Sequence, residues 1–260
     1  MTERTERGRF RREQMNEGLI EGRNALTEAL RAGRTIDKLY VASGDIDRTL
    51  SRLVAEAKQA GAVVVRTERA RLDQMSPTGA HQGVIASVAA HGYSSLDDVF
   101  ARAEARAEAP LIVLCDGLSD PHNLGAILRS AECAGAHGVI IPKRRSVGLT
   151  AVVGKASAGA LEYMPVVRVS NIAATIRTLK ERGVWVLGTA AEGTTRLYDA
   201  DFKGPTAIVI GSEGDGMSRL TAEQCDYLVS IPMRGEISSL NASAAAAILL
   251  YEAVRQRIGG

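Results

Sequence analysis

The chain has 260 residues, 45% of them hydrophobic and 24% charged, which is typical of a globular protein with one large or two small domains. No apolar run approaches the roughly 20 residues that span a bilayer, which excludes a membrane protein. The start, MTERTERGRF, lacks the apolar core of a secretory signal. Three scattered cysteines and four histidines without close pairing predict no disulfide framework and no metal site, and they fit a reducing cytoplasm.

The first 15 residues are predicted to form a basic, flexible arm. Five arginines and two glutamates fall within the first twelve positions, although the whole chain carries a formal net charge of only +2. Such an arm could follow RNA phosphates, or it could be a solvated terminus. Charge alone leaves both interpretations open.

Residues 16–90 alternate between amphipathic and apolar stretches, which predicts a small α/β domain. The following segment, 91–109, contains the tract ARAEARAEA, whose alternating charges predict an exposed helical linker. The expected helices of the small domain cover 19–32, 46–60 and 68–75, and its expected strands cover 36–42, 62–66 and 84–89.

A second α/β pattern runs from 110 to 260. Its apolar runs are separated mostly by helical stretches, and this is typical of a parallel sheet that helices cover on both faces. An alanine-rich stretch, 241–257, predicts a packed final helix. The expected strands are 111–115, 138–141, 166–169, 184–188, 206–210 and 228–231.

Neither common nucleotide-binding signature is present in this second region. The stretch from Gly148 to Gly154 has five residues between its glycines instead of the four of a P-loop, and Ala156 replaces the magnesium-binding Ser or Thr. The glycines of 211–216 are spaced G-x-x-G-x-G, which is not the dinucleotide fingerprint. The sequence therefore favours neither NTPase nor NAD chemistry.

Three polar segments follow predicted strands at the sheet edge where ligands of α/β proteins gather. The first, DGLSDPHNLGAILRSA, places Asn123 in the first turn of a helix and Arg129 off its apolar stripe. The second, IVIGSEGDGM, embeds Glu213 in a glycine-rich loop. The third, IPMRGEISSLNAS, crowds Ser239 and Asn241 at a helix start. Each segment taken alone also fits a structural role, as a cap or a tight turn.

Taken together, the three segments resemble the signature motifs of the SpoU (TrmH) family of RNA 2′-O-ribose methyltransferases. The resemblance covers about 110–260, and 16–90 resembles the substrate-binding domain of the ribosomal-RNA branch, whose members methylate a guanosine of 23S rRNA. It implies a small L30e-like α/β domain followed by a SPOUT-type parallel-sheet domain with a trefoil knot. It also implies S-adenosyl-L-methionine as cofactor, RNA as partner, a homodimer and a cytoplasmic location.

The resemblance also implies roles for individual residues. The expected cofactor-binding residues lie in the strand-end loops, and the small domain is expected to supply RNA affinity through Arg23, Arg34 and the pair His81–Gln82. An rRNA or tRNA 2′-O-methyltransferase of the antibiotic-resistance type and a catalytically inactive RNA-binding assembly factor remain as alternatives. The implied catalytic residues are Asn123, Arg129, Glu213, Ser239 and Asn241, and the implied cofactor-binding residues are Thr189, Gly211, Ile231, Met233 and Leu240.

Overall fold

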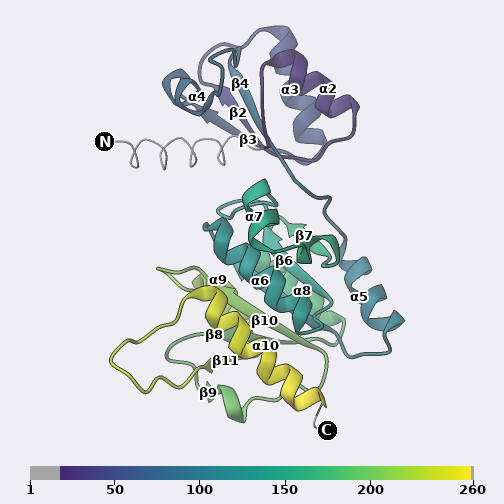
Figure 1. The fold of residues 1–260 in the computed structure, drawn as a ribbon, viewed down its shortest axis with the longest axis vertical. Helices are drawn as coiled ribbons and strands as arrows, with labels where there is room; N and C mark the ends of the chain where they lie inside the picture. The colour runs from purple at the N-terminus through teal and green to yellow at the C-terminus, as the bar shows by residue number, and fades with distance from the viewer. Residues whose placement is uncertain (1–17, 259–260) are drawn as a thin grey trace. The chain divides into compact units, whose positions relative to one another are not determined.

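The protein is seen in a computed structural model that describes residues 18–258, so the expected basic arm over 1–15 lies outside the described residues. The described chain forms two compact units (Figure 1). Of the described residues, the first unit contains 18–92 and 148–152, and the second contains 93–147 and 153–258. This agrees with the expectation of a small α/β domain followed by a larger one.

The first unit is a four-stranded sheet with strand order β1-β4-β2-β3. Its start differs from the expected helix over 19–32, because residues 19–21 form a strand that pairs antiparallel with β4. The helix begins only after Gly22, whose φ of 86° is not helical. The elements are β1 Leu19–Glu21, α2 Arg23–Arg31, β2 Ile36–Ala42, α3 Arg48–Gln59, β3 Val63–Thr67, α4 Arg69–Met75 and β4 Val84–Val88.

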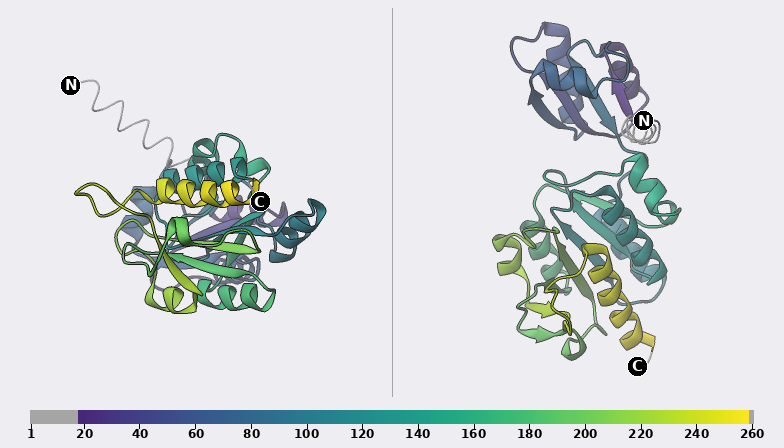
Figure 2. Two further views of the ribbon diagram at one scale, coloured as in Figure 1. Left: turned by 90° about the horizontal axis from the view of Figure 1, so that it is seen from below. Right: turned by 60° about the vertical axis from the view of Figure 1, so that its left-hand side comes forward.

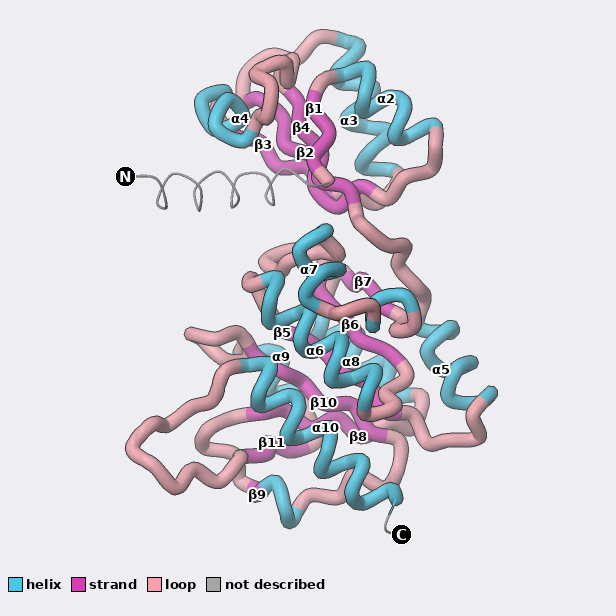
Figure 3. The backbone as a smooth tube through the Cα atoms, in the orientation of Figure 1, coloured by secondary structure: helices cyan, strands magenta, loops and turns pink. Residues whose placement is uncertain are grey.

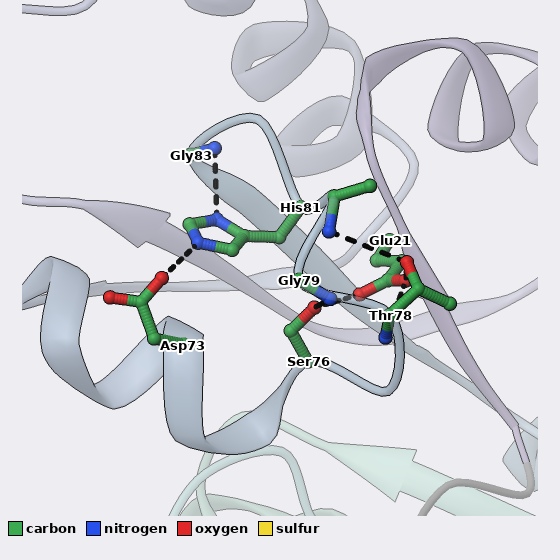
Figure 4. A network of polar contacts seen from close by, with 8 residues as sticks. Glu21, Asp73, Ser76, Thr78, Gly79, His81 and Gly83 are labelled. Carbon is green, nitrogen blue, oxygen red and sulfur yellow. Dashed lines mark hydrogen bonds and ion pairs between the residues drawn. The ribbon is translucent and has the colours of Figure 1, made fainter.

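A hydrogen-bonded loop, 76–83, connects α4 to β4 (Figure 4). The carboxylate of Glu21 accepts hydrogen bonds from the hydroxyls of Ser76 and Thr78. Burial acts to raise the pKa of Glu21, but these hydrogen bonds outweigh it and lower that pKa. The loop is thus fixed to the first strand of the sheet.

The same loop contains His81 and Gln82, which were expected to contact RNA. His81 is only 1% exposed, and its ring bonds to the Asp73 carboxylate and to the backbone N–H of Gly83. Gln82 accepts a hydrogen bond from the backbone N–H of Arg23. The expected RNA contact is therefore wrong for His81, because its side chain is buried and engaged within the fold. The side chain of Gln82 accepts a hydrogen bond at the start of α2 and so helps to cap this helix.

The second unit contains a seven-stranded sheet with strand order β7-β6-β5-β10-β8-β11-β9 (Figure 3). Every strand pair in it is parallel. This confirms the expected parallel sheet. Its elements are α5 Leu96–Ala105, β5 Leu111–Asp116, α6 Pro121–Cys133, β6 Gly138–Pro142, α7 Ala151–Ala156, β7 Val166–Val169, α8 Ile172–Glu181, β8 Trp185–Thr189, β9 Thr195–Arg196, β10 Thr206–Gly211, α9 Arg219–Gln224, β11 Tyr227–Ser230 and α10 Ala242–Ile258.

Helices cover both faces of this sheet (Figure 2). Residues of α5 and α8 form one buried cluster with alternate residues of the central strands, such as Ile112 and Leu114 of β5. The intervening residues point to the opposite face, where α6 and α10 pack beside each other and α10 also packs on β10. Burial on both faces explains why the central strands are apolar throughout.

Helix α5 differs from the exposed linker expected over 91–109. Ser95 begins it with a capping box, and its inner residues Val99 and Ala103 are buried. A Cβ placed on Gly138 would lie 2.4 Å from a methyl group of Val99, so β6 accepts this helix only because it has a glycine there. The charged tract, 101–109, therefore begins in a helix of the second unit and continues through the turn that follows it.

Candidate active site

The site is built at the carboxyl edge of the parallel sheet, where β5 and β10 end side by side at Asp116 and Gly211. The loop after β5 leads into α6, and the loop after β10 is the glycine-rich turn. The carboxylate of Asp116 accepts a hydrogen bond from the backbone N–H of Ser218 at 2.8 Å. This bond joins the first residue of the first motif to the residue that follows the second motif, 102 positions later.

The first turn of α6 fixes Asn123. Asp120 caps the helix by accepting a hydrogen bond from the backbone N–H of His122, and Pro121 occupies the first helical turn. Asn123 is 7% exposed. A Cβ on Gly125 would lie 2.4 Å from Cβ of Ala156, so this glycine lets the helix pack against a neighbouring segment at close range. The position of Asn123 is thus set by backbone packing.

Three predicted residues, one from each motif, form a single hydrogen-bonded cluster. The amide nitrogen of Asn123 donates to the carboxylate of Glu213. The amide nitrogen of Asn241 donates to the amide oxygen of Asn123 at 2.9 Å. The amide oxygen of Asn241 accepts from the backbone N–H of Ser243 at 2.9 Å, at the start of α10. The fold thus brings together positions 123, 213 and 241, and we call them the polar triad.

The glycine-rich loop folds back on the end of β10. Ser212 and Gly216 exchange two backbone hydrogen bonds of 2.9 and 3.1 Å. A Cβ on Gly211 would lie only 2.3 Å from the carbonyl carbon of Gly216, so no side chain fits at position 211. Gly211 therefore allows the turn that carries Glu213 to close.

A cavity of about 580 Å³ lies between the loops that follow β8 and β11, and no residue of the polar triad lines it. Four of the five expected cofactor-binding residues line it, namely Thr189, Ile231, Met233 and Leu240. Gly211 does not line it. Ser239 lines the cavity, although it was expected in the catalytic group. Leu240, which lines the cavity, is followed directly in the sequence by Asn241 of the triad.

Two charged residues that the sequence reasoning missed, Glu192 and Arg196, also line this cavity. Arg196 belongs to β9, a two-residue strand that pairs with β11. So short a strand leaves no periodic pattern in the sequence. The sequence could have pointed to these two residues in one way only: both follow shortly after the strand that ends at Thr189, at the sheet edge where ligands bind.

Arg129 is not part of the polar triad. It lies six residues after Asn123 on α6, and its side chain is exposed. Within residues 18–258 it makes no ion pair and no side-chain hydrogen bond. Asn123 thus faces the site interior, whereas Arg129 is available to a partner outside the described chain.

A second cavity, of about 510 Å³, lies near the opposite edge of the sheet, where β5 begins. Its main cation, Arg257, is already engaged, since its guanidinium donates to the carbonyl oxygens of Ala109, Phe202 and Gly204. None of the predicted site residues lines this cavity. Arg257 therefore serves to join the final helix to the starts of two strands.

Thiol chemistry is not supported at the interior of this unit. Burial raises the pKa of Cys115 to about 12, and burial together with nearby Asp226 raises the pKa of Cys225 to about 12. In the described part of the chain, no group of three or more His, Cys, Asp or Glu side chains is arranged to hold a metal ion. Nor does any described helix have the length and apolar character to cross a membrane.

Comparison with known proteins decides the family. Residues 110–251 match the SpoU rRNA Methylase family, and residues 19–94 match the family described as RNA 2′-O ribose methyltransferase substrate binding. The chain belongs to the SpoU methylase family. The two matched segments correspond to the two structural units, and the SpoU segment includes the polar triad and the lining of its cavity.

SpoU methylases of known sequence and structure resemble the chain over nearly its full length. The TrmH-family protein YacO of Bacillus subtilis is 48% identical over 238 residues, which cover 92% of this chain and 95% of YacO. The 23S rRNA (guanosine-2′-O-)-methyltransferase RlmB of Ralstonia nicotianae is 47% identical, with coverage of 92% and 96%. The crystal structure of the SpoU methyltransferase AviRb from Streptomyces viridochromogenes with AdoMet is 31% identical, with a TM-score of 0.60 and coverage of 96% and 94%.

Proposed function

We propose that this SpoU methylase transfers the methyl group of S-adenosylmethionine to the ribose 2′-hydroxyl of a guanosine in 23S rRNA. The single observation that carries the proposal is the polar triad, since its hydrogen bonds join all three family motifs into one site, and the third motif also lines the 580 Å³ cavity up to Leu240. The RlmB proteins of Ralstonia nicotianae and Shewanella oneidensis, 47% and 48% identical, carry this activity in their names.

The cavity suits S-adenosylmethionine in size and chemistry. Small-molecule sites commonly enclose roughly 300–1,000 Å³ and combine apolar walls with a few polar groups. Here Ile231, Met233 and Leu240 supply apolar surface, while Thr189 and Arg196 supply polar groups. When bound, the cofactor supplies a methyl carbon activated by its positively charged sulfur.

The residues of the chain must orient the ribose and help its proton to leave. In the transfer, the 2′-oxygen forms a bond to the methyl carbon while the carbon–sulfur bond breaks, and the hydroxyl proton passes to an acceptor. Asn123 is held rigidly by Glu213 and Asn241, so its amide can orient a polar group in the site. We assign Arg129 to a neighbouring RNA phosphate, because a guanidinium stays protonated and binds phosphate through two parallel hydrogen bonds.

Three further features complete the proposal. The loops around the cavity form the trefoil knot of the SPOUT fold, which α10 closes by packing against α6 and β10. The enzyme is a homodimer that associates mainly through its second unit. It acts in the cytoplasm, where rRNA is found, and its three free cysteines are in keeping with that reducing compartment.

The decisive experiment maps the methylated nucleotide. The full-length protein is incubated with methyl-tritiated S-adenosylmethionine and a 23S rRNA transcript, and we expect one 2′-O-methylguanosine. Asn123→Ala should abolish labelling but keep cofactor binding, as measured by calorimetry. Labelling of tRNA alone, or cofactor binding without labelling of any RNA, would overturn the proposal.

A further inference from the structure

Three consecutive cations, Lys143–Arg145, follow β6 at the carboxyl edge of the sheet. Strand β6 pairs in parallel with β5, so its end lies at the same edge as Asp116 and the first motif. Lys143 is half-buried, and the side chains of Arg144 and Arg145 are exposed. None of the three forms an ion pair with any of the residues 18–258. We call this stretch the basic segment.

The backbone of the basic segment is fixed at both ends. The N–H of Lys143 donates to the carbonyl of Val169 at 2.7 Å, and the N–H of Val147 donates to the carbonyl of Leu118 at 2.9 Å. Arg145 has a φ of 55°, a left-handed conformation that a residue with a side chain adopts only when its surroundings impose it. The segment thus presents its side chains from a defined backbone.

The basic segment borders the polar triad through Gly117. A Cβ on this glycine would lie 3.8 Å from the carbonyl oxygen of Arg145 and 3.9 Å from Cβ of Ser212. Ser212 is next to Glu213 of the triad. The backbone of Arg145 and the glycine-rich turn therefore lie on either side of Gly117. The guanidinium groups of Arg144 and Arg145 thus belong to a loop next to the loops that carry the triad.

We propose that the basic segment binds the phosphate backbone of the RNA next to the nucleotide that is methylated. Exposed guanidinium groups without a carboxylate partner are suited to phosphate, because each can bind two phosphate oxygens and release condensed counterions. Contacts to phosphate add affinity and fix the register of the RNA, and they carry no sequence information directly. This inference rests on the proposed RNA methyltransferase function.

The test compares an Arg144→Gln/Arg145→Gln variant with a matched control, Arg106→Gln. Arg106 is likewise exposed and free of ion pairs to the described residues, but it follows α5 just before β5, at the opposite edge of the sheet. Binding of the full chain to a 23S rRNA transcript is measured between 50 and 200 mM salt, chosen as roughly the range over which phosphate contacts lose most of their affinity.

The double variant should bind RNA roughly tenfold more weakly for each lost contact near 0.1 M salt, and its salt dependence should be shallower by about 0.9 per contact. The control should stay within about twofold of wild type, because it lies away from the site. Cofactor binding, measured by calorimetry, should be unchanged in both variants. If the double variant and the control bind RNA alike while the wild type methylates it, this inference fails and the proposed function stands. If the wild-type protein does not bind the transcript, the proposed function itself fails.

Discussion

At the scale of single residues, helix α6 places Asn123 in the protein interior and Arg129 at the surface. Asn123 is buried in the polar triad and is oriented by two side chains, whereas Arg129, six residues later, is exposed and free of ion pairs to residues 18–258. A buried amide with fixed partners suits positioning. An exposed guanidinium suits a ligand that arrives from solvent, as an RNA phosphate does.

We predict that Arg129→Lys and Arg129→Ala are impaired to a similar extent. Lysine keeps the charge but loses the planar fork that binds phosphate through two hydrogen bonds. The expected loss is about 2–4 kcal/mol of transition-state stabilisation, the range for removing one preorganised donor. Single-turnover methylation of rRNA measures it, and calorimetry should show unchanged cofactor binding. A near-normal rate for the lysine variant would mean that a point charge suffices.

His137 gives the protein a pH-dependent stability. Its ring is buried, with Nδ1 accepting from the backbone N–H of Leu111 at 3.0 Å and Nε2 lying 3.1 Å from the carboxylate of Glu108. Burial lowers the pKa of His137, although Glu108 acts to raise it. The unfolded chain therefore takes up a proton at a higher pH than the folded chain, so stability is lost as the pH falls below about 6.5.

The matching prediction uses urea unfolding followed through Trp185, the single tryptophan, which lies in the second unit. Between pH 7.5 and 5.5 we expect His137→Asn to lose less stability than the wild type, with an upper limit of about 1.4 kcal/mol per pH unit for one proton. The exposed His122, replaced by Asn, serves as the control and should follow the wild type. Equal losses in all three proteins would contradict the assignment.

At the scale of elements, the sequence predicted those whose pattern is local. The buried strands of the second unit appear as continuous apolar runs, and their expected ranges lie within one residue of the observed β5–β8, β10 and β11. Residues 19–21 were expected to begin a helix that runs to residue 32. They form a strand because they pair with β4, more than sixty positions away. The local sequence around 19–21 gives no information about that partner.

Helix α10 carries an exposed apolar stripe that suits the proposed dimer. Its inward alanines, such as Ala246 and Ala253, are buried within the chain, whereas Ile248, Tyr251 and Ile258 are 38%, 52% and 80% exposed. The alanines Ala242, Ala246 and Ala253 thus pack inside the chain, and the exposed side of the helix carries larger apolar residues. Large apolar side chains without a covering element are typical of an interface core.

We therefore predict that Ile248→Lys/Tyr251→Lys converts the dimer to a monomer. A two-fold axis places each substituted residue twice in one interface, so the added charges are buried and repel each other. Light scattering at micromolar concentration should give twice the chain mass for the wild type and one chain mass for the variant. Tyr163→Lys, at a position 68% exposed near α5, is the control and should remain a dimer. A monomeric wild type would refute the proposal.

At the scale of the whole molecule, the three polar segments predicted to gather at one edge of the sheet do meet there, but the sequence did not predict which of their residues contact each other. Asn123, Glu213 and Asn241 follow β5, β10 and β11, whose carboxyl ends share one edge of the parallel sheet, and the long loop after β11 carries Asn241 to the other two. The positions of Gly211, in a closed turn outside the cavity, and of Ser239, in the cavity wall, depend on irregular backbone, and their roles stay predictions. Loop conformation depends on packing that has no period in the sequence.

The division into two units leads to the last prediction, that residues 18–92 supply RNA affinity and the second unit supplies the chemistry. The first unit matches a substrate-binding family, and the polar triad and its cavity lie wholly in the second. Two linked binding surfaces raise affinity by roughly 10²–10⁴ over one surface alone. A chain of residues 93–260 should therefore bind S-adenosylmethionine like the full protein but methylate 23S rRNA with kcat/KM lowered by a factor in that range. Circular dichroism and the fluorescence of Trp185 check that the shortened chain is folded. Full kcat/KM on the same nucleotide would show that the first unit has another role.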